Sequence, residues 1–260
     1  MELGLQGKVA LVTGSSRGIG RAIAAALAAE GAEVMLTGRD EVALAEAAAL
    51  LKQRGGEVGT HAGDLREPAE TERLLTALNR RFGRLDILVN NAGATKRGDF
   101  FALSEADWQD GFALKFFAHV RLARAAWPLL KASQGSLLAI VGVGGRTPSA
   151  DFTIGSTVNA GCLAFTKALA DIGKRDGVQV NAINPGAVET ARFQRNLASL
   201  MAAEGLDEPA AKERFRREHG SIRIGQPEDI AGLAAFVLSA RGRWLHGAII
   251  DMDGGETRTL

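Results

Sequence analysis

The sequence predicts an α/β fold, a single-domain, Rossmann-type, doubly wound parallel sheet. Short apolar runs alternate with longer helical stretches along the whole chain. These runs are almost continuously apolar, as strands are when helices cover both faces of a parallel sheet. A glycine-rich segment joins the first apolar run to the first helical stretch, where folds of this class form a phosphate-binding turn.

The elements follow in a regular order. Strands are expected at 9–12, 33–37, 58–61, 86–89, 136–141, 178–183 and 248–251, and helices at 18–30, 40–54, 67–83, 105–131, 156–175 and 227–239. No linker or repeat divides residues 1–260, so we expect one domain. Residues 191–225 are a charged helical insertion. Its position beyond the carboxyl end of a strand makes it a candidate substrate lid, with a plain solvated insertion as the alternative.

Composition narrows the possible functions. The chain has 260 residues, is 46% hydrophobic and carries a formal net charge of +1, which argues against nucleic-acid and membrane-surface binding. One cysteine, Cys162, excludes an internal disulfide, and the four histidines lack metal-ligand spacing, so no metal site is expected. Neither a signal peptide nor a membrane span is expected, which predicts a cytoplasmic protein. Tyrosine is absent, so no mechanism here can use a phenol.

The segment T-G-S-S-R-G-I-G at residues 13–20 is the candidate phosphate-binding loop. It follows the first expected strand and opens the first expected helix. Glycines let the backbone turn tightly and approach a pyrophosphate, while the helix N-terminus offers free N–H groups and a positive dipole end. The alternative is a strand–helix turn without a ligand.

With this loop the chain resembles the short-chain dehydrogenase/reductase family. Three further family motifs follow in the expected order: Asp64-Leu65, N-N-A-G at 90–93, and N-P-G at 184–186 with Thr190. The resemblance covers essentially all 260 residues and implies a three-layer sandwich, a nicotinamide dinucleotide, a small-molecule substrate and a homo-oligomer, a tetramer or a dimer. The cofactor-binding residues it implies are Gly14, Ser16, Arg17, Gly18, Ile19, Arg39, Asp64, Leu65, Asn91, Ala92, Gly93, Pro185, Gly186, Val188 and Thr190.

The residues at the end of the second expected strand indicate which type of nicotinamide cofactor the chain binds. An acidic residue there would hold the ribose 2′-hydroxyl of NAD, but this chain has Gly38 followed by Arg39, with Arg17 in the phosphate loop. Two guanidinium groups suit a 2′-phosphate, so we expect NADP(H) to be favoured over NAD(H). The alternative is that both arginines are surface residues and that Asp40 pairs with Arg39.

The chain departs from the family at all four positions of its catalytic set, which are asparagine, serine, tyrosine and lysine. Counting from flanking residues puts Lys115 at the asparagine position, Gly142 at the serine, Gly155 at the tyrosine and Asn159 at the lysine. Lysine and asparagine have exchanged places. A lysine in a dry cleft has a lowered pKa, so Lys115 is the candidate general acid–base and Asn159 its positioning partner.

The two glycines are expected to leave a pocket for water or for a bulky substrate group. The loop 142–146, which ends in Arg146, is either an anion-binding loop or a loop without a role once the serine is lost. Asp151 and Thr153 are substitute catalytic candidates. Ser156 is expected to cap the next helix, and Cys162 to pack in the core.

The leading expectation is an NADP(H)-dependent oxidoreductase that moves hydride to or from a carbonyl or alcohol without a tyrosine. A silent NADP(H)-binding pseudoenzyme, acting as a sensor or partner subunit, is the first alternative. A lyase or isomerase on the same fold is the second. Apolar residues of the helices 105–131 and 156–175 are expected to face a symmetry mate: Leu122, Ala126, Leu129, Leu163, Phe165 and Leu169.

Overall fold

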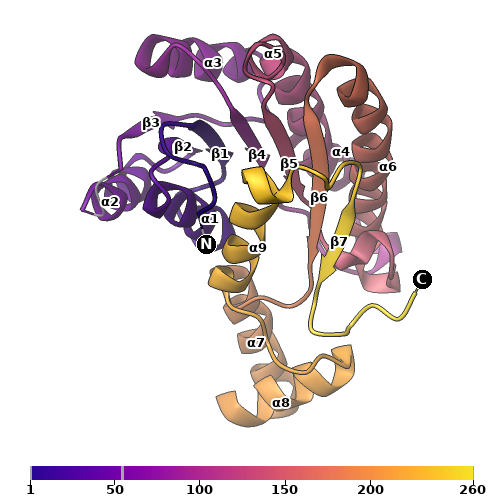
Figure 1. Ribbon diagram of the computed structural model, residues 1–260. Coiled ribbons are helices and arrows are strands. Elements are labelled where there is room, and N and C mark those ends of the chain that lie inside the picture. Colours follow the sequence, from indigo (N-terminus) through magenta and orange to yellow (C-terminus); the bar gives the residue numbers. More distant parts are fainter. Residues whose placement is uncertain (1, 54–55, 260) are drawn as a thin grey trace.

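The computed structural model describes residues 2–53 and 56–259, and seven parallel strands form one sheet in the order β3-β2-β1-β4-β5-β6-β7 (Figure 1). The strands are β1 (Val9–Thr13), β2 (Glu33–Gly38), β3 (Val58–Ala62), β4 (Ile87–Asn90), β5 (Ser136–Ile140), β6 (Gln179–Pro185) and β7 (Ile249–Met252). All seven predicted strands are present, and the predicted fold class is confirmed. The strand order changes direction between β1 and β4, the place where open α/β sheets bind ligands.

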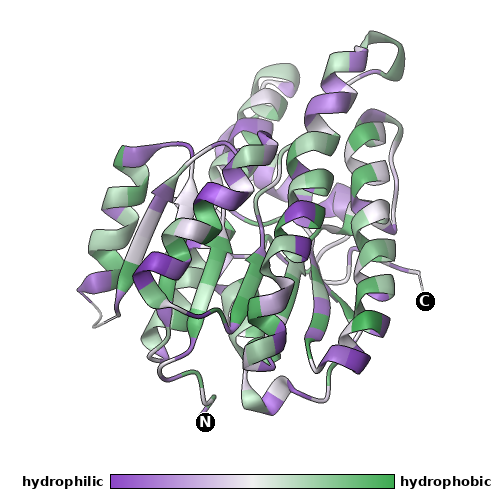
Figure 2. Cartoon of the chain, turned by 90° about the horizontal axis from the view of Figure 1, so that it is seen from above, coloured by the Kyte–Doolittle hydropathy of each residue, from purple (hydrophilic) through white to green (hydrophobic). Residues whose placement is uncertain are grey.

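Helices cover both faces of the sheet. The helices are α1 (Gly18–Ala29), α2 (Glu41–Lys52), α3 (Pro68–Phe82), α4 (Glu105–Phe112), α5 (Ala118–Ser133), α6 (Thr153–Asp176), α7 (Ala191–Glu204), α8 (Glu208–His219) and α9 (Pro227–Leu238). α1, α2 and α9 pack on one face, and α3, α5 and α6 on the other (Figure 1). Figure 2 shows the hydrophobic strands enclosed between these two layers.

Three helical predictions need correction. The stretch predicted as one helix over 105–131 is α4, a π-helical turn at Ala113–Phe117, and α5, which continues past Pro128 to residue 133. Helix α6 begins at Thr153, so Ser156 lies inside the helix and does not cap it. The predicted helix 40–54 ends at Lys52, and residue 54 lies outside the described residues. The insertion 191–225 contains α7 and α8, which extend beyond the end of the sheet (Figure 1).

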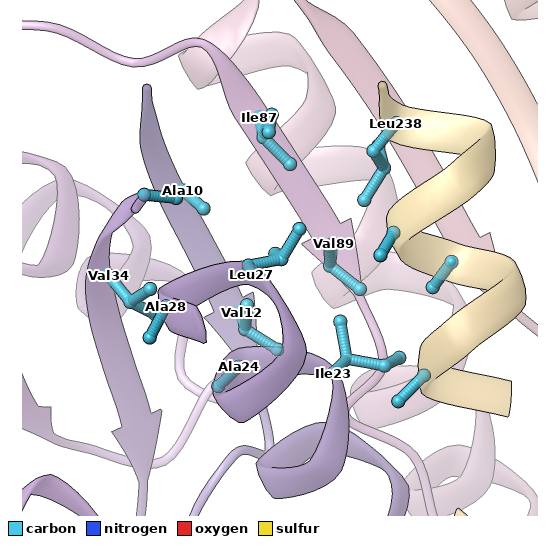
Figure 3. Packing of buried hydrophobic residues seen from close by; sticks show 14 of the residues in the cluster. Ala10, Val12, Ile23, Ala24, Leu27, Ala28, Val34, Ile87, Val89 and Leu238 are labelled. Carbon is cyan, nitrogen blue, oxygen red and sulfur yellow. The ribbon is translucent and has the colours of Figure 1, made fainter. Parts of the chain in front are cut away.

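The core between the sheet and α1 depends on small side chains. Ile23 and Leu27 of α1 are fully buried near Val89 of β4, and α9 contributes Leu238 (Figure 3). Alanines such as Ala24 fill the remaining positions and let α1 approach the sheet closely. Burying each large aliphatic side chain contributes about 1.5–3 kcal/mol, so this layer holds the phosphate loop at the start of α1 firmly in place.

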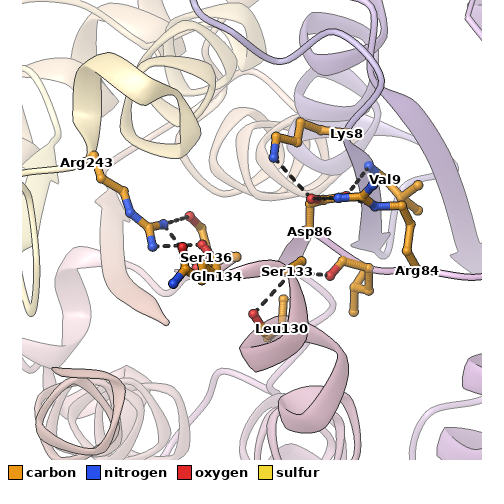
Figure 4. A network of polar contacts seen from close by, with 11 residues as sticks. Lys8, Val9, Arg84, Asp86, Leu130, Ser133, Gln134, Ser136 and Arg243 are labelled. Carbon is orange, nitrogen blue, oxygen red and sulfur yellow. Dashed lines mark hydrogen bonds and ion pairs between the residues drawn. The ribbon is translucent and has the colours of Figure 1, made fainter. Parts of the chain in front are cut away.

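A polar network ties together the amino ends of the strands. Asp86 accepts hydrogen bonds from Arg84 Nη2 at 2.7 Å, from the Val9 N–H at 3.0 Å and from Lys8 Nζ at 3.2 Å (Figure 4). Arg243 donates to the Gln134 carbonyl at 2.7 Å and to the Gly177 carbonyl at 2.8 Å. These contacts stabilise the amino ends of the strands. The family motifs lie at the opposite, carboxyl ends. No helix in the described part of the chain is long and apolar enough to cross a membrane.

Candidate active site

Two glycines with positive φ shape the loop between β1 and α1. Gly14 has φ 63° and Gly18 has φ 58°, in the left-handed region that favours glycine. A Cβ at Gly14 would lie 3.0 Å from the Cα of Ala92, and one at Gly20 would lie 2.4 Å from the Gly14 carbonyl oxygen. At its glycines the loop therefore offers backbone without side chains at a helix N-terminus. These residues fit the phosphate groups of a dinucleotide.

Asn91 fixes this loop against the end of β4. Its Nδ2 donates to the Thr13 carbonyl at 2.8 Å and to the Gly14 carbonyl at 3.2 Å. In return the Thr13 hydroxyl accepts from the Asn91 N–H at 2.8 Å and the Ala92 N–H at 2.9 Å. Thr190 approaches from the end of β6, with its Cγ2 3.5 Å from a Cβ built at Gly18. The three motifs predicted from the sequence thus meet at the carboxyl ends of β1, β4 and β6.

Arg39 directly follows β2, and it forms no ion pair with Asp40, the acidic residue next to it in the sequence. Asp40 caps α2 by accepting from the Ala43 N–H at 3.1 Å, so the alternative pair with Arg39 is not formed. Arg39 instead lies with Nη1 3.8 Å from Asp64 Oδ2, at an ion-pair distance that leaves its side chain 64% exposed. Gly38 leaves room for Ser16, whose Oγ is 3.4 Å from a Cβ built at Gly38. Arg17 is exposed and forms no ion pair with a described residue.

Lys115 is a buried cation on the π-helical turn. Its side chain is 7% exposed, and Nζ donates to the Val141 carbonyl at 2.7 Å. Desolvation, followed by the positive charge of Arg192, lowers the pKa of Lys115 from 10.5 to about 8. Gly93 makes room for it, since a Cβ there would lie 2.9 Å from Lys115 Cδ. Turns of this type recur at functional sites because they re-aim a side chain.

Asn159 lies against the same loop as Lys115. It is 2% exposed, its Nδ2 is 3.2 Å from a Cβ built at Gly142, and its Oδ1 has no partner among the described residues. An unpaired buried acceptor costs about 1–3 kcal/mol, which a ligand hydroxyl would recover. Lys115 and Asn159 therefore both lie beside residues 141–142, which follow β5.

The predicted pocket at Gly155 is filled, which corrects the sequence interpretation. A Cβ built at Gly155 would lie 2.0 Å from Cζ of Phe152, so this ring occupies the space that a side chain at 155 would need. The ring also lies 3.0 Å from a Cβ built at Gly144, and the guanidinium of Arg97 covers it at 4.3 Å from the centroid. An aromatic ring without a hydroxyl group thus fills the volume next to Gly155.

The other candidates have partners that limit their chemistry. Asp151 is exposed and accepts from Arg97 Nη1 at 2.6 Å; desolvation raises its pKa, but the Arg97 and Ser149 hydrogen bonds outweigh this and hold it below its usual range. Arg146 pairs with Asp251 at 2.7 Å, so the loop 142–146 does not present a free cation. Thr153 begins α6, with a buried Oγ1 that lacks a described partner.

Cys162 is a packed thiol, as predicted. It is 2% exposed, and its Sγ–H donates to the Lys115 carbonyl at 3.4 Å. Burial raises its pKa to about 11, so it stays protonated and unreactive at neutral pH. This contact joins α6 to the π-helical turn at Lys115.

Sequence reasoning missed two residues of this site, Phe152 and Arg192. No pattern marks Phe152, because it lies three positions before the glycine whose space it fills. Arg192 follows the Thr190 motif by two positions, and its Nη2 donates to the Gly93 carbonyl at 2.7 Å. That nearness to a motif is the only sequence signal for either residue.

A family model described as enoyl-(acyl carrier protein) reductase matches residues 14–257, a span that contains all the motifs above except Thr13. The chain belongs to the short-chain dehydrogenase/reductase family. It is 34% identical to the D-beta-hydroxybutyrate dehydrogenase of Cupriavidus necator over 253 residues, which cover 96% of this chain and 98% of the relative. It is 33% identical to a 3-oxoacyl-acyl-carrier-protein reductase of Vibrio cholerae over 257 residues, 97% of this chain and 98% of the relative.

A solved structure matches this short-chain dehydrogenase/reductase over its whole length. L-sorbose reductase from Gluconobacter frateurii, complexed with NADPH and L-sorbose, has a TM-score of 0.96 and 33% sequence identity, with 100% of both chains covered. The coarse prediction from the sequence, a short-chain oxidoreductase of the nicotinamide-dependent type, is confirmed.

Proposed function

We propose that this chain is an NADP(H)-dependent reductase or dehydrogenase of a small carbonyl or alcohol, with Lys115 in place of a tyrosine as the general acid–base. The observation that carries the proposal is the buried Lys115 ammonium, whose pKa is lowered to about 8. A group with a pKa near the working pH can both donate and accept a proton. The matched relatives, whose names describe a hydroxy-acid dehydrogenase, an oxoacyl reductase and a ketose reductase, support the reaction class.

Different residues of the chain would bind the cofactor, transfer the proton and position the substrate. The loop at Gly14 and Gly18 would hold the pyrophosphate, and Arg39, Arg17 and Ser16 would hold a 2′-phosphate. Bound there, the dinucleotide supplies or accepts the hydride. Lys115 Nζ would give a proton to the substrate oxygen in reduction and take it back in oxidation. Asn159 Oδ1, which lacks a described partner, would accept a hydroxyl hydrogen and keep the ligand beside Lys115.

Cofactor preference is directly measurable. We expect calorimetry to show tighter binding of NADPH than of NADH, because Arg17 and Arg39 meet a phosphate that NADH lacks. Arg39→Ala should cost about 1.5–3 kcal/mol of NADPH binding free energy, the range for a charge-assisted hydrogen bond, and should leave NADH binding nearly unchanged. Arg73→Ala, which removes an equally exposed arginine from α3, is the control. Equal affinity of the wild type for both cofactors would contradict the assignment.

A silent nucleotide-binding protein is the second candidate. The observation that favours it is the Phe152 ring at Gly155, because a ring without a hydroxyl group cannot donate a proton. A panel of aldehydes, ketones and oxo acids tested with NADPH separates the two functions. Turnover of any of them that depends on Lys115 supports the enzyme. NADPH binding without turnover across the panel supports the silent protein.

Assembly into a homo-oligomer remains a proposal, on a different set of residues from those first expected. Leu122, Ala126, Leu163 and Leu169 lie in the chain's own core and cannot face a partner. Of the six residues first expected, only Leu129 and Phe165 are partly exposed. Exposed aromatic residues near α4 and α5 take their place: Phe100 is 52% exposed, Phe101 92% and Phe117 50%. Such an apolar patch is typical of an interface. We expect light scattering at micromolar concentration to show a dimer or tetramer; a monomer would contradict this proposal.

A further inference from the structure

Arg192, which contacts the neighbour of Lys115, has no carboxylate partner among the described residues. Arg192 is the second residue of α7, and among the described residues its side chain makes one hydrogen bond, from Nη2 to the Gly93 carbonyl at 2.7 Å. Neither Arg192 nor Arg195 forms an ion pair with a described residue. Since a guanidinium has five N–H donors, Arg192 keeps most of its hydrogen-bonding capacity for a ligand.

Arg192 also interacts electrostatically with other cations. The pKa of Arg192 is lowered by desolvation and then by the positive charges of Arg195 and Arg97. The positive charge of Arg192 in turn lowers the pKa of Lys115. Arg192 therefore contacts Gly93, the neighbour of Lys115, and also interacts electrostatically with two further guanidinium groups. Like charges held this close are unfavourable unless a counter-charge arrives.

The nearby carboxylates act on Arg97 instead. Asp151 pairs with Arg97 Nη1 at 2.6 Å. Glu256 of the C-terminal segment interacts electrostatically with Arg97, and burial raises the pKa of its carboxyl group. Neither of them pairs with Arg192. The excess positive charge is thus concentrated between Gly93, beside Lys115, and the start of α7.

Resting on the function proposed above, we infer that the substrate carries a carboxylate and that Arg192 binds it, so that the reaction interconverts an oxo acid and a hydroxy acid. Arginine binds a carboxylate with two parallel hydrogen bonds, which would fix the carbonyl at a set distance from Lys115. Because Arg192 lies on the insertion 191–225, this contact would also hold that segment against Gly93. A neutral ketone, or an oxo acid whose carboxylate has been converted to a methyl ester, would lack this anchor.

A second oxyanion, the pyrophosphate of the cofactor, would suit the same guanidinium. The experiment therefore compares short 2-, 3- and 4-oxo acids with their methyl esters at saturating NADPH, alongside calorimetric NADPH affinity. We expect acids to be favoured over esters at least 10-fold in kcat/KM. Arg192→Met should reduce kcat/KM for the acids about 10- to 100-fold, leave the esters and NADPH affinity unchanged, and so abolish the preference. Arg192→Lys should retain part of it.

The control removes an equal charge elsewhere on the same insertion: Arg217→Met on α8, where Arg217 pairs with Glu213. Equal or faster turnover of the esters by the wild type overturns the inference and leaves the oxidoreductase function intact. Loss of NADPH affinity in Arg192→Met with an unchanged acid-to-ester ratio assigns the arginine to the cofactor and also overturns it. If nothing is turned over, calorimetric titration of the NADPH-loaded protein with the acids decides: binding that depends on Arg192 supports the inference, and absence of binding overturns it.

Discussion

Replacing Lys115 with methionine should reduce turnover by about 10²–10⁴, the loss typical of removing a general acid–base. Methionine keeps the length and the apolar stem of the side chain while deleting its charge and its proton. The reduction rate of the wild type should fall as the pH rises through about 8, because the protonated donor is lost, and the oxidation rate should rise over the same range. Both pH steps should be missing from the residual activity of Lys115→Met.

A stability measurement separates this loss from misfolding. Because burial lowers the pKa of Lys115 from 10.5 to about 8, the folded state binds fewer protons than the unfolded state between these values. The contribution of Lys115 to the free energy of unfolding is therefore most unfavourable below pH 8 and improves as the pH rises towards 10.5. Urea denaturation at pH 7 and pH 10 should show this improvement in the wild type and a smaller one in Lys115→Met.

Lys52→Met, an exposed lysine of α2, is the matched control for charge and should leave both turnover and its pH profile unchanged. If Lys115→Met loses NADPH affinity and keeps kcat, then Lys115 holds the cofactor and does not transfer the proton. Unchanged activity would remove Lys115 from the mechanism altogether. Thr153, whose hydroxyl group is buried without a described partner, would then be the next residue to vary.

Local sequence patterns predicted most of the fold. The strands are buried on both faces, so their apolar runs stood out, and glycines marked the turn before α1. The break at Ala113–Phe117 was not predictable, because the helical periodicity continues through a π-helical turn almost unchanged. The start of α6 was predicted three residues too late, at Ser156, because serine is a common helix cap and Phe152, which holds that position, is not.

The parts of the candidate site that depend on backbone conformation were predictable from the sequence. The parts that depend on which side chain fills a given volume were less predictable. The loop at Gly14 followed from residue spacing, because only glycine adopts its left-handed backbone without strain. The pocket expected at Gly155 was wrong, since no spacing rule says which neighbour fills the volume that a glycine leaves. The charge environment of Arg192 was only partly visible, because Arg195 is near in the sequence, whereas Arg97 and Lys115, with which Arg192 also interacts, are distant.

Gly155→Ala should destabilise the protein by about 1–3 kcal/mol, the cost typical of overpacking. The backbone at Gly155 is helical, so an alanine there would ordinarily stabilise α6 by several tenths of a kcal/mol. The new Cβ would lie 2.0 Å from Cζ of Phe152, however, and the ring is held between Gly144 and the guanidinium of Arg97. The steric clash should therefore reverse the sign, lowering Tm by about 2–4 °C for each kcal/mol in a chain of this size.

A double-mutant cycle shows whether the Phe152 ring is the cause. Phe152→Ala removes the clash, so adding Gly155→Ala to it should be neutral or stabilising, with a coupling energy of about 1–3 kcal/mol between the two positions. Gly232→Ala in α9, where a new Cβ would meet no atom within 4 Å, is the matched control and should stabilise. If Gly155→Ala behaves like Gly232→Ala in chemical denaturation, the ring does not fill this space in solution.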